Sequence, residues 1–314
     1  MEIIVQGILL VLGFVMLIKG ADWFVEGASG IADRFGIPQL VIGLTIVAFG
    51  TSAPEAAVSI SAAMKGNADI TIGNVVGSNI LNILIILGLT AVICPIAVQK
   101  STFKYEIPYV IIVSALIFGL GYFDQTVSRI DGVILWVLMI VYMLYLLNMA
   151  KKGENSAEVM AEDEKKPIWK MIIFVVIGLV LIVWGSDVTV EAATNIALVF
   201  GVSERIIGLT IVALGTSLPE LMTSVTAARK GKADIAIGNI VGSNIFNILF
   251  VVGTTAVITP IVYAGNFLVD SVMMVGSAVL LWLCLLGKEK KLKRWAGAVM
   301  LALYAGYLIY MFMS

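Results

Sequence analysis

Two glutamates, Glu55 and Glu220, lie in strongly apolar segments, and the residues around them are nearly the same. Residues 43–55 read GLTIVAFGTSAPE and residues 208–220 read GLTIVALGTSLPE, at an offset of 165 residues. A charged side chain at the centre of a membrane-spanning helix costs about 2.5–3.5 kcal/mol on insertion scales. Because this cost arises at two equivalent positions beside Gly and Pro, we expect the two carboxylates to bind a cation together.

The segments that follow each glutamate are rich in asparagine and serine, and they repeat at the same offset. Residues 73–84 read GNVVGSNILNIL and residues 238–249 read GNIVGSNIFNIL. Ser78 and Asn82 are four residues apart and therefore share one face of a helix. Carboxylate, amide and hydroxyl oxygens together form an all-oxygen donor set. Such a set suits hard cations, among which Ca²⁺ takes six to eight oxygen ligands.

A proline stands immediately before each glutamate. In the first half, Gly50 and Pro54 bracket Thr51 and Ser52. Because proline has no N–H and clashes with the preceding turn, we expect the helix to kink or break near residues 50–53. The second half repeats this arrangement with Gly215, Thr216, Ser217 and Pro219. A break frees backbone carbonyls at membrane depth, where a protein group or a bound ion must satisfy them.

The elements that carry these residues are predicted to be membrane-spanning helices. The chain has 314 residues, of which 60% are hydrophobic and only 13% are charged, whereas soluble domains are about 25% charged. Apolar stretches of about 20 residues are long enough to cross a bilayer as helices. We predict an all-α membrane protein with ten transmembrane helices, some of them broken at the ion site. The predicted spans cover about residues 3–30, 38–63, 70–93, 106–122, 129–149, 168–196, 203–228, 235–258, 266–286 and 293–313.

The two halves of the chain form an internal repeat with a polar linker between them. Residues 1–150 hold the first five predicted spans, residues 151–167 the linker, and residues 168–314 the second five spans. Because each repeat has an odd number of spans, the second copy must enter the membrane from the opposite side. Inverted repeats of this kind place substrate sites near the membrane midplane, where the halves meet.

The basic residues favour one orientation in the membrane. If the N-terminus lies outside, the loops that face inward carry 16 of the 20 Lys and Arg residues. Cytoplasmic loops are enriched in Lys and Arg. We therefore predict a multi-pass protein of the cytoplasmic membrane, with both termini outside and the 151–167 linker in the cytoplasm. The net charge of −1 gives no support for a nucleic-acid partner.

The doubled motifs resemble those of the cation/Ca²⁺ exchanger superfamily, and within it the prokaryotic Na⁺/Ca²⁺ exchangers. The resemblance rests on GTSAPE at 50–55, GTSLPE at 215–220, GSNILN at 77–82 and GSNIFN at 242–247. It implies an antiporter in which Glu55 and Glu220 bind Ca²⁺ and Na⁺ in turn. The further ligands that it implies are the backbone carbonyls of Thr51 and Thr216, those of Ala48 and Ala213 for Na⁺, the side chains of Ser52, Ser217, Ser78 and Ser243 at the Na⁺ sites, and Asn82 and Asn247 at the centre.

One departure from the superfamily pattern bears on the transported ions. Some relatives, including potassium-dependent ones, carry Asp at the position of Asn247, whereas both central positions are Asn here. We therefore expect no potassium co-transport. The family's large cytosolic regulatory domain is also missing, so we expect a minimal prokaryotic member. Ca²⁺, Na⁺ and the lipid bilayer are the expected partners, and we expect neither a cofactor nor an obligatory protein partner.

Three other functions stay open on the sequence. A proton/Ca²⁺ exchanger of the same fold is the nearest, because glutamates also carry protons. A cation channel usually builds its pore from several subunits, whereas this chain holds two carboxylates of its own. An intramembrane enzyme is the least favoured, since the chain has no histidine for a metal motif. Separately, the Gly and Ser residues of the motifs also fit a role in helix packing.

The first and sixth predicted spans differ from the other eight in length and composition. Both are unusually long, contain no proline and lie outside the doubled motifs. Gly13 and Gly20 in the first span, with Gly178 and Gly185 in the sixth, permit close and smooth helix contacts. We expect these two spans to move against the rest of the protein during alternating access.

Overall fold

The computed structural model describes residues 2–68, 70–154, 167–201, 213–263 and 267–313, and these are almost entirely helical. Within these ranges, seven helices are long and apolar enough to cross a membrane, and one bent pair makes up to eight. A helix satisfies its own backbone hydrogen bonds, as the hydrocarbon core requires. The protein is therefore an all-α membrane protein, while the total of ten spans stays a prediction.

Six long helices form the outer parts of the molecule. They are α1 (Glu2–Phe35), α7 (Ile107–Phe123), α8 (Arg129–Glu154), α9 (Ile168–Val199), α15 (Phe267–Cys284) and α16 (Arg294–Met313). A π-helical turn, η3 (Thr102–Glu106), leads into α7. Only 17% of the most apolar window of α1 is buried, against 94% for the helix that covers Ala233–Ile258. The outer helices thus present apolar side chains to lipid.

The inner helices carry the doubled motifs and are interrupted. The first run comprises α2 (Gln39–Ile42), η1 (Gly43–Val47), α3 (Ala48–Thr51) and α4 (Ala53–Met64), and the second comprises α5 (Ile70–Leu81), η2 (Asn82–Leu87) and α6 (Gly88–Ile93). The later runs comprise α11 (Ala213–Thr216) with α12 (Leu218–Arg229), and α13 (Ala233–Phe246), η6 (Asn247–Val252) and α14 (Gly253–Ile258). The π-helical turns η2 and η6 begin at Asn82 and Asn247, and such turns occur often at functional sites.

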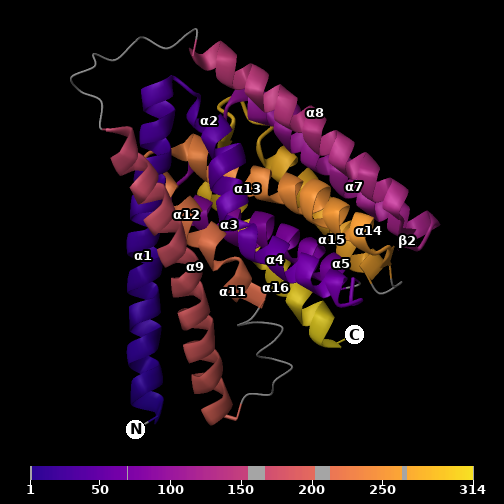
Figure 1. Ribbon diagram of the computed structural model, residues 1–314, viewed down its shortest axis with the longest axis horizontal. Helices are drawn as coiled ribbons and strands as arrows, with labels where there is room; N and C mark the ends of the chain where they lie inside the picture. The colour runs from indigo at the N-terminus through magenta and orange to yellow at the C-terminus, as the bar shows by residue number, and fades with distance from the viewer. Residues whose placement is uncertain (1, 69, 155–166, 202–212, 264–266, 314) are drawn as a thin grey trace.

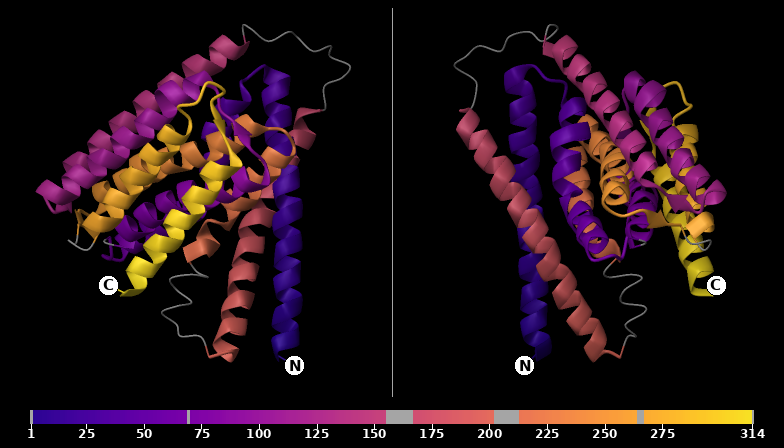
Figure 2. Two further views of the ribbon diagram at one scale, coloured as in Figure 1. Left: turned by 180° about the vertical axis from the view of Figure 1, so that it is seen from behind. Right: turned by 45° about the vertical axis from the view of Figure 1, so that its right-hand side comes forward.

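Helices α1 and α9 lie side by side and run in opposite directions, and their lower ends extend beyond the other helices (Figures 1 and 2). Glycines line their contact. A Cβ atom on Gly20 would lie 2.8 Å from the carbonyl oxygen of Gly178, and one on Gly13 would lie 3.0 Å from that of Gly185. The close contact predicted for these four glycines is therefore confirmed. Because any side chain here would collide with backbone, α1 and α9 pack as one unit.

Contacts between the halves occur in matched pairs. Strand β1 (Ile96–Ala97) pairs antiparallel with β4 (Lys291–Leu292), and β2 (Thr126–Val127) pairs antiparallel with β3 (Ile261–Val262). Adding the 165-residue offset to β1 and β2 gives β3 and β4, so each half contributes one strand to each pair. The close approach of Gly88 to Gly297 and that of Gly253 to Gly132 are related in the same way. Every one of these contacts joins one half to the other.

The structure shifts the start of one predicted span and describes two predicted segments only in part. The span predicted from residue 106 begins earlier, because η3 continues the helix back to Thr102. The span predicted over 203–228 and the 151–167 linker fall partly outside the described residues. The described part of the predicted 203–228 span begins at Ala213.

Candidate cation site

Each glutamate lies in the first turn of a helix that starts immediately after a break. Helices α3 and α4 meet at Ser52 (φ −86°, ψ 5°) with a bend of 49°. Pro54 lies at the start of α4, where its missing N–H needs no partner. Ser217 (φ −94°, ψ 3°) separates α11 from α12 in the same way. The breaks predicted from the prolines are thus present, and they place Glu55 and Glu220 at the positive ends of helix dipoles.

The two glutamates are buried where the halves meet. Both are 1% exposed. The hydroxyl of Ser52 donates a hydrogen bond to Oε1 of Glu220 at 2.9 Å, which links the break in the first half to the carboxylate of the second. Oε2 of Glu55 and Oε2 of Glu220 are both buried without a hydrogen-bond partner among the described residues.

Four asparagines, two from each half, form a network where α5 and η2 meet α13 and η6. Asn79 donates from Nδ2 to the backbone oxygen of Asn244 at 3.2 Å, and Asn244 donates back to that of Asn79 at 3.3 Å. Asn82 donates to Oδ1 of Asn244 at 2.9 Å, and Asn247 donates to Oδ1 of Asn79 at 3.2 Å. These bonds use the NH₂ groups of Asn82 and Asn247. Their Oδ1 atoms stay buried and have no partner in the described part of the chain.

Several buried oxygens of the doubled motifs thus have no hydrogen-bond donor among the residues that the structure describes. They are Oε2 of Glu55, Oε2 of Glu220, Oδ1 of Asn82, Oδ1 of Asn247 and Oγ of Ser217. A buried acceptor left without a partner costs about 1–3 kcal/mol, and more when it is charged. A cation bound among such oxygens would remove that cost, because carboxylate, amide and hydroxyl oxygens are the ligands of hard cations.

Other residues predicted for the site lie beside these oxygens. Ser243 donates to the backbone oxygen of Ala48 at 3.4 Å, and Thr51 donates from Oγ1 to Oδ1 of Asn239 at 3.0 Å. Ser78 is buried on α5, one helical turn before Asn82. In the second half, Thr216 is half-buried and Ala213 begins α11.

The sequence prediction missed three supporting residues. Asn74 donates to the backbone oxygen of Glu55 at 3.1 Å and to Ser59 Oγ at 2.9 Å. Asn239 donates in the same pattern to the backbone oxygen of Glu220 at 3.3 Å and to Ser224 at 2.9 Å. Both asparagines belong to the doubled GN pairs, so the 165-residue repeat could have indicated them. The third residue is Ser186 of α9, which donates to the Gly215 carbonyl at 2.6 Å. Its equivalent position in the first half is Ala21, so the repeat could not have indicated it.

The family model described as "Sodium/calcium exchanger protein" matches this chain twice, over residues 5–148 and over residues 170–313. The chain belongs to this family. The two matched segments are separated by the same 165-residue offset as the motifs. The resemblance to the cation/Ca²⁺ exchanger superfamily is thereby confirmed, and the chain is a multi-pass membrane protein and a cation/Ca²⁺ antiporter.

Individual relatives match the chain nearly end to end. The sodium/calcium exchanger MaX1 of Methanosarcina acetivorans is 35% identical over 99% of this chain and 99% of its own length. The inner membrane protein YrbG of Escherichia coli is 38% identical over 88% of this chain and 87% of its own. A solved structure of the sodium-calcium exchanger NCX_Mj, soaked with 10 mM Na⁺ and zero Ca²⁺, covers 98% of this chain and 99% of its own with a TM-score of 0.83 and 36% identity.

Proposed function

We propose that the protein exchanges Ca²⁺ for Na⁺ across the cytoplasmic membrane by alternating access, with both ions bound in turn between Glu55 and Glu220. The observation that carries this proposal is a set of buried oxygens, contributed by both halves, that have no hydrogen-bond partner among the described residues. The name of MaX1, a sodium/calcium exchanger similar along nearly the whole chain, supports Na⁺ as the counter-ion. The name of YrbG, an inner membrane protein, supports the location.

The charge of the site explains why the two ions would alternate. Two ionised glutamates carry a charge of −2, which one Ca²⁺ or two Na⁺ neutralise. Binding both loads together would leave an excess positive charge in a water-poor site, where Coulomb repulsion is strong. A site that either ion satisfies, but that cannot hold both, performs exchange.

The proposed ligand set extends beyond the glutamates to both halves. It comprises the backbone carbonyls of Thr51, Thr216, Ala48 and Ala213, the hydroxyls of Ser52, Ser217, Ser78 and Ser243, and Asn82 and Asn247 at the centre. The unpartnered Oδ1 atoms of Asn82 and Asn247 support their assignment. Since neither of these two side chains is charged, the set supplies no further anionic group for a potassium ion.

We propose the architecture of two inverted five-helix repeats, residues 1–150 and 168–314, joined by a cytoplasmic linker at 151–167. The two matches of the family model and the exchanged strand pairs support the repeat. The opposite directions of α1 and α9, which are equivalent under the offset, support the inversion. The distribution of Lys and Arg supports an orientation with both termini outside.

We propose that α1 and α9 move as a unit to expose the site to each side in turn. Their glycine-lined contact supports a joint movement, since it holds the two helices together more closely than side chains would allow. The hydrogen bond from Ser186 to the Gly215 carbonyl connects α9 to the broken segment beside Glu220. Coupling requires that ion occupancy favour the two positions differently.

The decisive experiment is Ca²⁺ flux into proteoliposomes that contain the purified protein. We expect flux when a Na⁺ gradient is imposed and almost none when choline replaces Na⁺. The double variant Glu55→Gln/Glu220→Gln controls for leakage. Flux that follows a pH gradient and ignores Na⁺ would replace the proposal with proton/Ca²⁺ exchange.

A further inference from the structure

A third buried carboxylate lies outside the cation site. Glu106, the last residue of η3, is 1% exposed. The hydroxyl of Tyr145 on α8 donates a hydrogen bond to its Oε1, whereas its Oε2 is buried without a partner in the described ranges. The hydroxyl of Tyr142, one helical turn before Tyr145, is also buried and has no hydrogen-bond partner in the described part of the chain. Two oxygens that can accept hydrogen bonds are therefore left unused in this cluster.

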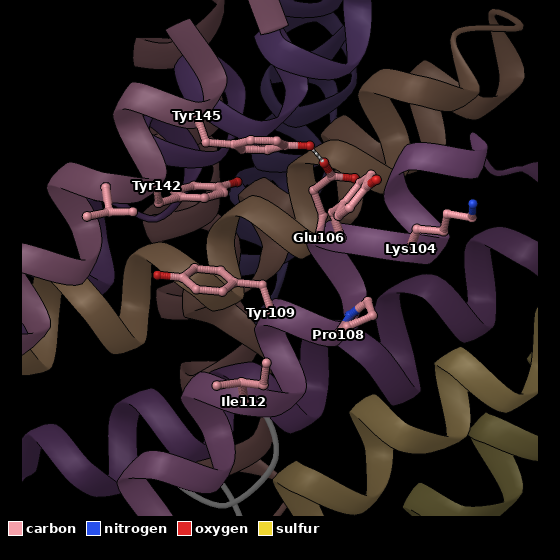
Figure 3. Close-up of a pocket in the computed structure, with 9 residues that line it drawn as sticks. Lys104, Glu106, Pro108, Tyr109, Ile112, Tyr142 and Tyr145 are labelled. Carbon is pink, nitrogen blue, oxygen red and sulfur yellow. Dashed lines mark hydrogen bonds between the residues drawn. The ribbon is translucent and has the colours of Figure 1, made fainter. Parts of the chain in front are cut away.

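Glu106, Tyr142 and Tyr145 are among the residues that line a cavity of about 320 Å³ between η3, α7 and α8. Figure 3 shows Glu106, Tyr109, Tyr142 and Tyr145 gathered around it. A water molecule occupies about 30 Å³ of liquid. The space is therefore much larger than one ion or one water needs, and it is large enough for a small organic group.

The lining favours an organic ammonium group over a metal ion. The rings of Tyr109 and Tyr142 are stacked with centroids 5.6 Å apart, and the Tyr109 hydroxyl holds its ring in place by donating to the Leu138 carbonyl at 3.2 Å. Ammonium groups bind against aromatic faces and beside carboxylates. Ca²⁺, by contrast, takes six to eight oxygen ligands, whereas the side chains of this mostly apolar lining include one carboxylate and a few phenol hydroxyls.

The position of the cavity indicates that the ammonium group belongs to a lipid. Ile112 and Val141, which also line it, are exposed on the outer face of α7 and α8. The cavity lies beside the middle of α8 and where η3, which carries Lys104, leads into α7. Tyrosines and basic residues gather where helices meet lipid headgroups. Lys104 lines the cavity on the side of Glu106 away from Tyr142 and Tyr145 (Figure 3).

We propose that this cavity binds the headgroup of a phospholipid with a primary amine, of the phosphatidylethanolamine class. Its three N–H donors supply what Oε2 of Glu106 and the Tyr142 hydroxyl lack, and the tyrosine rings that line the cavity lie beside its positive charge. Lys104 binds the phosphate, and the acyl chains lie against Ile112 and Val141. A phosphatidylglycerol headgroup offers no cation to the carboxylate, and a choline headgroup offers no N–H.

The equivalent position in the second half lacks these features and supplies a control. Ser271 stands where Glu106 stands, and its hydroxyl is hydrogen-bonded to that of Tyr263. Tyr307 stands where Tyr142 stands, and it donates to Asp270 at 2.7 Å. Because these hydroxyls already have partners, Tyr307→Phe is a matched control for Tyr142→Phe.

The test is native mass spectrometry of the purified full chain, titrated separately with dioleoyl phosphatidylethanolamine, phosphatidylcholine and phosphatidylglycerol. We expect the wild-type protein to bind phosphatidylethanolamine most tightly, and Glu106→Gln to bind it about tenfold more weakly, as loss of a charge-assisted hydrogen bond predicts. Tyr142→Phe should weaken this lipid several-fold, and Tyr307→Phe should not. Phosphatidylglycerol binding should be the same in all four proteins.

Three results would overturn the proposal. The first is equal binding of phosphatidylethanolamine and phosphatidylglycerol by the wild-type protein. The second is unchanged affinity for phosphatidylethanolamine in both Glu106→Gln and Tyr142→Phe. The third is equally tight binding of soluble phosphoethanolamine, which would indicate a free metabolite in place of a lipid. If Glu106→Gln fails to fold, Tyr142→Phe against Tyr307→Phe decides the question, because both variants keep every carboxylate.

Discussion

A buried amide can present either its NH₂ group or its oxygen to a cavity, and at Asn82 and Asn247 the neighbours decide which. Each side chain donates to an asparagine of the other half. This leaves both Oδ1 atoms as acceptors, as a cation requires. At the proposed site this orientation is set before any ion arrives, so we expect ion binding to spend little free energy on turning these two side chains.

At the carboxylates, we predict that Glu55→Gln and Glu220→Gln each lower apparent Ca²⁺ affinity by more than a hundredfold, corresponding to a loss of roughly 3 kcal/mol or more. Each change removes one of two formal charges that face a divalent ion. Isothermal calorimetry and proteoliposome flux measure the effect. Glu289→Gln is the control, because the Glu289 side chain is exposed and forms an exposed ion pair with nearby Lys293. Near wild-type flux in either site variant would refute the paired-carboxylate site.

The supporting asparagines give a prediction for stability and for binding. We predict that Asn239→Ala and Asn74→Ala each destabilise the protein by roughly 1–3 kcal/mol and weaken Ca²⁺ binding. Asn239 bonds to the backbone oxygen of Glu220, to Ser224 and to Thr51, and Asn74 bonds to the backbone oxygen of Glu55 and to Ser59. Thermal unfolding with and without Ca²⁺ measures both effects. Unchanged Ca²⁺ binding in both variants would show that these asparagines do not help to hold the glutamates in place.

The residues proposed for the cation site stand out in the sequence because they occur twice. A lone glutamate in an apolar segment has many explanations, but Glu55 and Glu220 share their neighbours at one offset. The roles of Asn74 and Asn239 could not be assigned in the same way. Their side chains reach back to a carbonyl on another helix, and that contact depends on how two helices pack.

At the scale of elements, α1 and α9 differ from the inner helices in how they are held. They contact each other through backbone and glycine, and Trp23 of α1 stacks on Phe174 of α9 with centroids 6.0 Å apart. Toward the interior, α1 buries apolar side chains against Ala227 and Ala228 of α12, and Lys230, which follows α12, forms an ion pair with Asp22 at 3.1 Å. An exposed ion pair contributes at most about 1 kcal/mol, and apolar contacts are not directional, so neither contact fixes α1 at one position along α12.

We predict that a short bis-thiosulfonate linker between Asp22→Cys and Lys230→Cys stops Ca²⁺ flux but leaves Ca²⁺ binding intact. The linker ties α1 to α12 and so prevents movement of the outer pair against the interior. The background carries Cys94→Ala and Cys284→Ala, and reduction should restore flux.

The matched control joins α1 to α9 through Trp23→Cys and Phe174→Cys. If the two helices move as one unit, this linker should leave flux nearly unchanged. Loss of flux with this control, together with full flux in the α1–α12 protein, would show that the two helices move separately.

Element boundaries were predictable where one residue type sets them. Pro54 and Pro219 indicated both breaks, because proline cannot continue the hydrogen bonds of a preceding helix. The start at Thr102 was missed, since nothing in TFKYE marks it as helical. The strand pairs were also missed, because β1 and β4 are distant in sequence and only two residues long.

For the whole molecule, the balance of ionic charge predicts competition between the two ions. We predict that the apparent dissociation constant for Ca²⁺ rises steadily with Na⁺ concentration, because both ions need the same two glutamates. Calcium titrations at several Na⁺ concentrations, with ionic strength held constant by choline, measure this. An affinity indifferent to Na⁺ but sensitive to pH would favour proton coupling.

The exchanged strands constrain the order in which the protein can be made. A ribosome completes β1 and β2 long before β3 and β4 exist, so the first half cannot close either strand pair while it is being synthesised. Asn79 and Asn82 must likewise wait in the membrane for Asn244 and Asn247. The first half therefore spends part of its biogenesis as an incomplete, polar intermediate, which insertion machinery must shelter until translation reaches the second copy.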